Sequence, residues 1–390
     1  MHDVIVVGGG PVGSRVSGQL AGMGHRVLAV DEKEDLGGQI CCTGIVSREC
    51  VSSFAIGGNV ISQQLGSAKF FSPSAKVLRL WREEPQACVV DRAAFNVALA
   101  RWAQDKGVEY VLDSSVRGIE VGNDRVRVEV TGRGERVSFL EAQAVVIATG
   151  SSSRLAEGLG LGRFGDFVAG AQAEVEVGGL EEVEVYFGQD IAPGFFAWLV
   201  PTSPGRALVG LLSRRRPGFF ITKLISSLQA QGKIVSCQAE LNYGGVSLKP
   251  LSRTYRDRLI VVGTAAGQVK PTTGGGIYYG LLCADVAASC LNRALEREDL
   301  SNRSLASYER EWKKKLGWEL RIGYRARKLY EQLSDRQLDR IFDIIKDTGI
   351  DETLLRAEDL SFDWHAKAVL RLMGHWALLK IIGVKMLSFF

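Results

Sequence analysis

Short apolar runs at the start of the chain predict a βαβ unit. Residues 3–7 are continuous and mostly β-branched, the pattern of a parallel strand buried on both faces. Residues 14–23 carry small side chains on one face and end at Gly24, which predicts a helix. Residues 26–30 predict a second strand that ends at Asp31. Together the segments have the length of one βαβ unit.

Later segments alternate between strand and helix periodicity. Apolar residues recur every three to four positions over 92–106, so a helix is expected there. A long alanine-rich helix is expected over 277–294, and charged amphipathic helices from 304 to 390. A β-meander and two continuous apolar strands are predicted at 116–121, 125–130, 136–141, 144–148 and 259–262.

The first strand enters a glycine fingerprint. Gly8, Gly10 and Gly13 match G-x-G-x-x-G, in which the glycines permit a tight turn, a close backbone approach to a pyrophosphate and close helix–strand packing. The helix N-terminus then faces the anion. Asp31 stands where an acid would bind ribose hydroxyls. The combination predicts a dinucleotide site but does not distinguish NAD from FAD.

A second strand–glycine loop–helix pattern favours FAD. The strand at 259–262 enters the loop Gly263–Gly276, far along the chain from the first turn. Two such loops need one extended ligand that touches both, and FAD has that length. Backbone N–H groups of Gly274, Gly275 and Gly276 are expected to face the N1/C2 oxygen edge of the flavin and to stabilise the reduced, anionic form.

The predicted fold is therefore α/β. We expect a discontinuous Rossmann-type FAD-binding domain at 1–165 and 249–300, an inserted antiparallel β-sheet substrate domain at 166–248, and a C-terminal helical region at 301–390.

Composition excludes several other classes. The net charge of +4 is small and spread along the chain, which argues against a nucleic-acid binder. The seven cysteines are odd in number and follow no secretory signal, so no disulfide framework is expected. No metal-ligand spacing and no histidine triad is found. No uncharged apolar stretch is long enough to span a membrane, and we expect a cytoplasmic location.

Four motifs together resemble the p-hydroxybenzoate hydroxylase-type flavoproteins, and within them most closely the geranylgeranyl reductase family. They are Gly8–Gly13, Val90–Arg92, Ala148–Gly150 and Gly263–Gly276. The resemblance covers about residues 1–300. Three further segments are similar to the reductase branch: Ile40–Gly44 to its cysteine motif, Phe196–Pro201 with Ala207–Leu211 to its substrate-pocket signature, and Pro271–Gly276 to its loop over the flavin.

This resemblance implies a function and a set of site residues. The reaction would be reduction of C=C bonds in a prenyl chain of a lipid, quinone or chlorophyll precursor, with hydride delivered from reduced FAD. Cys42 and Trp198 would serve the chemistry. Besides the first glycine turn and Asp31, FAD would be bound by Arg92, Gly150, Gly263, Thr264, Pro271 and Gly274–Gly276. The substrate would contact Phe195, Phe196, Trp198 and Pro201.

The chain departs from the family pattern at several positions. Thr264 replaces an aspartate that would hold a ribityl hydroxyl, although a threonine hydroxyl can still donate and accept a hydrogen bond. Phe196 and Val200 replace a tyrosine and a phenylalanine of the signature, which leaves the particular isoprenoid undefined. Cys42 is equally consistent with a small buried apolar residue.

Alternatives remain open for the reaction, the electron donor and the C-terminus. An FAD- and NADPH-dependent aromatic monooxygenase shares the fold, and an electron-transfer flavoprotein could pass electrons to a membrane quinone. The donor is NADPH or a ferredoxin, because no second complete dinucleotide fingerprint is visible. Residues 366–390 form a basic amphipathic pattern that suits either a peripheral membrane contact or packing on the protein itself; its cations are Lys367, Arg371, His375 and Lys385.

Overall fold

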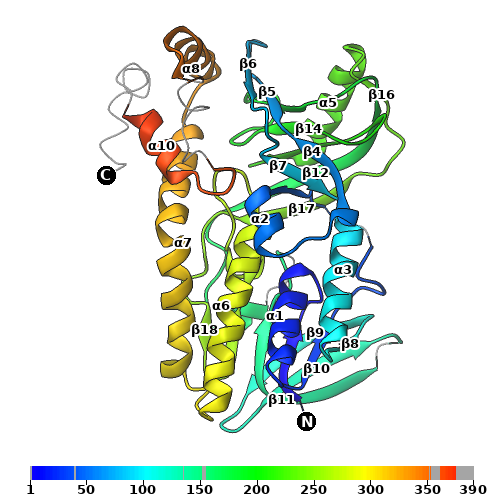
Figure 1. The fold of residues 1–390 in the computed structure, drawn as a ribbon, viewed down its shortest axis with the longest axis vertical. Helices are drawn as coiled ribbons and strands as arrows, with labels where there is room; N and C mark the ends of the chain where they lie inside the picture. Colours follow the sequence, from blue (N-terminus) through cyan, green and yellow to red (C-terminus); the bar gives the residue numbers. More distant parts are fainter. Residues whose placement is uncertain are drawn as a thin grey trace.

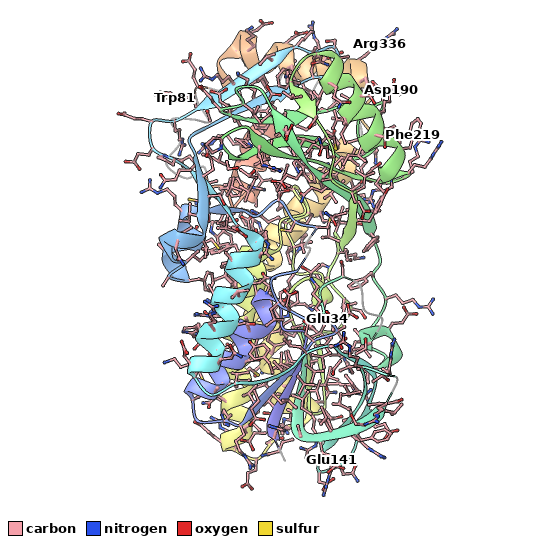
Figure 2. All side chains as sticks on the ribbon, turned by 90° about the vertical axis from the view of Figure 1, so that its right-hand side faces the viewer. Glu34, Trp81, Glu141, Asp190, Phe219 and Arg336 are labelled. Carbon is pink, nitrogen blue, oxygen red and sulfur yellow. The ribbon has the colours of Figure 1, made fainter. Side chains whose placement is uncertain are left out.

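A computed structural model describes residues 2–38, 41–134, 136–151, 155–350, 352 and 361–374. Two large sheets occupy the two ends of an elongated molecule, and helices run along its length (Figure 1). Figure 2 shows this separation from the side, with Glu141 of the first sheet and Arg336 of a C-terminal helix at opposite ends.

The first sheet has eight strands in the order β18-β19-β11-β1-β2-β8, and β10 and β9 continue from β11. Its central strand β1 pairs in parallel with both β11 and β2, as expected for a Rossmann-type sheet. The strands are β1 (His2–Val7), β2 (Val27–Val30), β8 (Glu109–Val111), β9 (Ser114–Val121), β10 (Val126–Gly132), β11 (Val137–Ile147), β18 (Tyr255–Arg256) and β19 (Leu259–Val261).

Strand β11 joins two of the expected strands into one. Its first half pairs antiparallel with β10, and its second half pairs in parallel with β1 and β19. The change of partner lies at Ala142, which is paired with both Val126 and His2. A single long strand therefore serves both the meander and the parallel sheet.

Both faces of the first sheet are buried, which explains the continuous apolar strands. Val4 and Val6 of β1 face a core formed with the helices, and Ile5 and Val7 face a second core formed with the meander. The helices on the first face are α1 (Pro11–Gly22), α3 (Arg92–Asp105), α6 (Ile277–Glu296) and α7 (Asn302–Tyr330).

The second sheet also has eight strands, in the order β16-β12-β15-β14-β13-β5-β6, with β17 paired to β12. Helix α5 (Pro217–Ala230) packs on one face of it. Its strands are β5 (Ser67–Phe71), β6 (Val77–Trp81), β12 (Phe167–Val177), β13 (Val183–Tyr186), β14 (Ala197–Ser203), β15 (Arg206–Ser213), β16 (Ile234–Ser236) and β17 (Asn242–Ser247).

This sheet extends beyond the segment 166–248 that the sequence suggested. Strand β13 pairs in parallel with β5, so residues 67–81 add two strands from an earlier part of the chain. The expected division leaves these strands out, because strand pairing across such a separation has no local sequence signal. That one parallel pair also makes the sheet mixed rather than purely antiparallel.

Smaller elements connect the two sheets. A three-stranded sheet has the order β3-β7-β4, and its strands are β3 (Ile45–Ser47), β4 (Ile61–Leu65) and β7 (Ala87–Val90). The short helices are α2 (Arg48–Ser53), α4 (Leu155–Gly158), η1 (Gly58–Val60) and η2 (Gly263–Ala266).

The C-terminal region contains α7, α8 (Asp335–Thr348) and α10 (Ala366–Met373). Helix α7 packs along α6 and reaches from the first sheet toward the second (Figure 1). Within the described ranges, no helix is both long and apolar enough to cross a membrane.

Candidate flavin and substrate site

A cavity of about 1660 Å³ lies between the two large sheets. Its wall includes both glycine loops on one side and apolar side chains of the second sheet on the other. One continuous space therefore connects the predicted cofactor residues with the predicted substrate residues.

The first glycine turn is closed so tightly that side chains would not fit. Gly8 has φ +107°, and a Cβ atom there would lie 2.5 Å from the Ala148 carbonyl oxygen. A Cβ on Gly13 would lie 1.8 Å from the Gly8 oxygen. A Cβ on Gly10 meets nothing within 4 Å, and Gly10 lines the cavity at the start of α1. Gly13 is thus a packing residue beneath the turn, whereas Gly8 and Gly10 lie on its open side.

Asp31 lies on the cavity wall at the end of β2. Its carboxylate accepts a hydrogen bond from Gly9 N at 2.6 Å and another from Lys33 N at 2.9 Å. These bonds fix the carboxylate beside the glycine turn. Each oxygen still has capacity to accept from a ribose hydroxyl.

Arg92 provides the test of whether the cavity suits an anionic cofactor. It begins α3, lines the cavity and packs its stem against Gly44. Its Nε and Nη1 atoms are buried and have no hydrogen-bond partner among the described residues. Buried guanidinium N–H groups without acceptors are costly, and a phosphate-bearing ligand would satisfy them. The residues present therefore fit FAD.

The second glycine loop follows β19. Gly263 has φ +73°, and its N–H donates to Gln268 Oε1 at 2.7 Å. Gln268 in turn donates to the Tyr308 hydroxyl on α7 at 2.9 Å. Gly263 itself is buried below the wall, whereas Thr264 lines the cavity close to Gly276. Gly150, with φ +73°, lines the wall near the first turn.

Two of the three glycine N–H groups expected to face the flavin are instead hydrogen-bonded within the loop. Gly274 N donates to the Lys270 carbonyl at 2.7 Å, and Gly275 N donates to Thr273 Oγ1 at 3.3 Å. These two N–H groups are used to close the loop, because the chain must turn back before α6 begins. Gly276, the N-cap residue of α6, and the first turn of that helix remain the positions that can face a flavin.

The loop is held from outside by residues that the sequence did not indicate. Arg327 of α7 donates to the Pro271 carbonyl at 3.2 Å and to the Thr272 carbonyl, and it lies 3.7 Å from the Phe195 ring centroid. Burial lowers the pKa of Arg327 to about 10, so it stays protonated at neutral pH. Pro271 does not line the cavity, and its role is to accept the Arg327 hydrogen bond at its carbonyl oxygen.

The C-terminal segment reaches the same loop. Lys270 Nζ donates to Asp363 Oδ1 at 2.6 Å, and Thr272 Oγ1 lies 2.5 Å from His365 Nδ1. Lys270, Thr272, Asp363 and His365 all line the cavity. Lys270 and Thr272 lie within the Gly263–Gly276 motif, but no motif indicated Asp363 or His365, since only the packing of the C-terminal segment brings them to the loop.

The opposite wall of the cavity is apolar and aromatic. Trp198 on β14 lies directly opposite Gly210 on β15, where a Cβ would come within 2.6 Å of the indole ring. Its Nε1 is buried and has no partner in the described part of the chain. Phe196 and Phe187 extend the aromatic wall, with ring centroids 5.9 Å apart.

Two predicted substrate residues do not line the cavity. Phe195 is fully buried beneath Phe196, with ring centroids 5.0 Å apart, and its carbonyl accepts from the Tyr330 hydroxyl at 2.5 Å. Pro201 is paired with Ala207 inside the sheet. Successive side chains of a strand point to opposite faces, so only part of a contiguous motif can reach the cavity.

Both cysteines of the predicted motif line the cavity. Burial, with a smaller effect of the adjacent Cys42, raises the pKa of Cys41 to about 11. Cys41 Sγ lies 3.4 Å from the Asn242 carbonyl oxygen. Cys41 is therefore a protonated thiol at neutral pH. Across the described ranges no cluster of ligating side chains could hold a metal ion.

Comparison with known proteins agrees with this geometry. A family model for FAD-dependent oxidoreductases matches residues 63–218. A digeranylgeranylglycerophospholipid reductase from Methanothermobacter thermautotrophicus is 30% identical over 87% of this chain and 90% of its own length. This chain belongs to the geranylgeranyl reductase family.

Other members and fold relatives extend the comparison. The digeranylgeranylglycerophospholipid reductase of Methanocaldococcus jannaschii is 29% identical over 90% of this chain and 93% of its own length. A geranylgeranyl bacteriochlorophyll reductase-like crystal structure from Thermoplasma acidophilum superposes with a TM-score of 0.87 at 23% identity, covering 100% of this chain and 99% of that one.

The same fold also occurs in more distant proteins. A halogenase solved in complex with FAD has the same fold, with a TM-score of 0.68 at 15% identity over 98% of this chain and 87% of that one. The family model and the reductase relatives, rather than this likeness of fold, show that the chain is an FAD-dependent oxidoreductase.

Proposed function

We propose that this reductase-family protein hydrogenates C=C bonds in geranylgeranyl-type chains of a lipid. The names of its relatives suggest the substrate class. The observation that carries the proposal is the single cavity, whose wall changes from the glycine loops of the cofactor to the apolar side chains of the second sheet. A hydrocarbon chain needs such an apolar surface next to the cofactor.

Bound FAD would supply hydride chemistry, and the chain's own residues would orient the alkene. An isolated alkene is a poor hydride acceptor, so its alignment must supply much of the rate. Trp198 is held against Gly210 and therefore has little freedom to move. Together with Phe196 and Phe187 it forms a firm wall that excludes water and fixes the chain.

Cys42 is our candidate for a proton-relay or flavin-tuning group, since it lies on the cavity wall. A relay predicts that Cys42→Ala slows alkene reduction while leaving reduction of the bound flavin by dithionite unchanged. Cys41→Ala is the matched control, because the Cys41 thiol is held at the Asn242 carbonyl and its pKa is raised. Equal rates for all three proteins would leave Cys42 as a packing residue.

The direct test of the reaction is anaerobic. Dithionite-reduced holoprotein is incubated with digeranylgeranyl glycerophospholipid, geranylgeranyl diphosphate and a prenylated quinone, and products are analysed by mass spectrometry. We expect at least one lipid to gain two hydrogens per reduced bond. Oxygen-dependent hydroxylation of an aromatic, with unchanged lipids, would instead favour the monooxygenase. Electron transfer to a quinone head group with its prenyl chain intact would favour the electron-transfer flavoprotein.

We propose NADPH, docking transiently, or a reduced ferredoxin as the electron donor. In the described part of the chain only one turn, after β1, joins two parallel strands through a glycine fingerprint. Stopped-flow bleaching of the oxidised flavin by each donor under anoxia distinguishes them. A donor is excluded if it reduces the oxidised flavin more slowly than the dithionite-reduced protein reduces the lipid.

We also propose a peripheral membrane contact through the C-terminal helix. Lys367 and Arg371 are exposed on α10, whereas Ala366 and Met373 are buried toward the protein. His375 and Lys385 of the predicted stripe lie outside the described residues. A Lys367→Glu/Arg371→Glu variant should lose co-sedimentation with anionic vesicles while retaining its flavin. Equal sedimentation of both proteins would refute the contact.

A further inference from the structure

The loop before α6 contains a buried ion pair with the C-terminal segment. Lys270 Nζ lies 2.6 Å from Asp363 Oδ1 and 3.2 Å from the Phe362 carbonyl oxygen. The two side chains are 6% and 1% exposed. Lys270 belongs to the Gly263–Gly276 loop, but its ion pair is not needed to close that loop, because the backbone bonds of Lys270 to Gly274 and Gly275 already do so.

The pair lies next to the place where a flavin must bind. A Cβ on Gly275 would lie 2.8 Å from Lys270 Cε and 3.4 Å from Nζ. The lysine side chain therefore passes close to the Gly275 backbone. Lys270, Asp363 and the three glycines all line the same cavity.

The carboxylate of this pair is only half satisfied. Asp363 Oδ1 accepts from Lys270, but Oδ2 is buried and has no hydrogen-bond partner among the described residues. An ion pair that served only to hold two segments together would be expected to have all its acceptors occupied. An orphaned oxygen on a cavity wall indicates that the pair faces something else.

The other charged groups around the loop do not replace Lys270. Arg327 approaches it from α7 but is directed to the Pro271, Thr272 and Gly194 carbonyls. His365 is neutral at physiological pH, because burial and the charge of Lys270 lower its pKa to about 4. Glu319 accepts from the backbone N–H groups of His365 and Ala366, and Glu49 accepts from Tyr278 and Trp364.

We propose that the positive charge of Lys270 raises the reduction potential of the bound flavin. Asp363 holds the Lys270 side chain in place, and its negative charge partly opposes this effect. Reduction of FAD to its anionic form takes up two electrons and one proton and adds one negative charge. A buried cation beside the ring stabilises that charge, and a carboxylate at the same place opposes it. The inference rests on the FAD site and not on the prenyl substrate.

The test is the two-electron potential of purified holoprotein, measured by equilibrium titration with a reference dye under anoxia. In Lys270→Met we expect the ratio of reduced to oxidised flavin at fixed potential to fall at least tenfold, about 30 mV for a two-electron couple. Lys270→Arg should stay within threefold of the natural protein. Asp363→Asn, which leaves the cation unopposed, should raise the ratio.

The opposite signs separate charge tuning from structural damage. A loop that is merely loosened would weaken FAD binding and shift both variants in the same direction, and that result would overturn the proposal. So would an unchanged potential in Lys270→Met. Lys233→Met is the matched control, because Lys233 forms a similar 2.7 Å pair with Glu184 in the second sheet, away from the cavity wall.

Each variant also has a readout independent of electron transfer. The dissociation constant of FAD, measured by calorimetry, shows whether the loop is intact. If Lys270→Met does not bind FAD, Lys270→Arg and Asp363→Asn still test the proposal. The reduction potential of Asp363→Asn should be higher than that of Lys270→Arg, and a lower potential would overturn the proposal. Failure of the lipid assay would leave these potentials unaffected, so this proposal and the proposed function fail separately.

Discussion

Replacement of Arg92 by methionine tests whether this chain holds its cofactor through a guanidinium that is unsatisfied without it. Methionine keeps most of the apolar stem that packs against Gly44 and removes the charge. The two buried donors Nε and Nη1 disappear with it. The perturbation therefore acts on hydrogen bonding far more than on packing.

The structure predicts effects of opposite sign on the two forms of the protein. A hydrogen bond to a charged group contributes about 1.5–3 kcal/mol, so loss of two would weaken FAD binding by about 3–6 kcal/mol, or roughly two to four orders of magnitude in Kd. In the apoprotein, removal of two unsatisfied buried donors should leave stability unchanged or raise it by up to about 2 kcal/mol.

Two measurements and one control check this prediction. FAD affinity is measured by fluorescence quenching, and apoprotein stability by urea unfolding. Arg258→Met is the control, since the Arg258 guanidinium donates to the Asn123 and Gln143 carbonyls away from the cavity. It should destabilise the apoprotein by about 2 kcal/mol and leave FAD affinity unchanged. A Kd within twofold of the natural value in Arg92→Met, or equal destabilisation by both substitutions, would refute the reasoning.

Substitutions at two glycine positions of the first turn, at Gly210 and at His365 test other parts of the same geometry. Gly10→Ala should change apoprotein stability by no more than about 0.5 kcal/mol but weaken FAD binding. Gly13→Ala should prevent folding of the first turn, because its Cβ would lie 1.8 Å from the Gly8 oxygen. Thermal melts of both variants with and without FAD compare these effects. Gly210→Ala should displace Trp198 and raise the KM for the prenyl lipid with the flavin spectrum unchanged, and an unaltered KM would contradict the proposed wall. His365 has a folded pKa of about 4 against 6.5 unfolded, so the unfolded chain binds a proton first as pH falls. The contribution of His365 to the free energy of unfolding is fully present above about pH 6.5, and about 2 kcal/mol of it should be lost between pH 7 and pH 5. Urea unfolding of His365→Asn over this range should not show that loss. The same dependence of unfolding free energy on pH in both proteins would exclude His365 as its source.

Local sequence patterns were sufficient to predict the cofactor end of the molecule. The βαβ unit, its glycine turn and the acid at Asp31 are local features, and local backbone geometry dictates them: Gly8 and Gly13 are required because any side chain there would collide with the adjoining backbone. The second loop was predictable for the same reason. The α/β class and the family were thereby confirmed by the fold and the relatives.

The way the rest of the chain surrounds that cofactor site depends on long-range packing, which has no local sequence signal. Which residues of the Phe195–Pro201 segment reach the cavity depends on the face that β14 turns toward it, and the addition of β5 and β6 depends on pairing with a strand more than a hundred residues later. Lys270, Arg327 and Asp363 meet only because α7 and the C-terminal segment pack over the flavin loop. The periodicity of apolar residues indicates which face of a helix or strand is buried, but it does not indicate which distant element packs against that face.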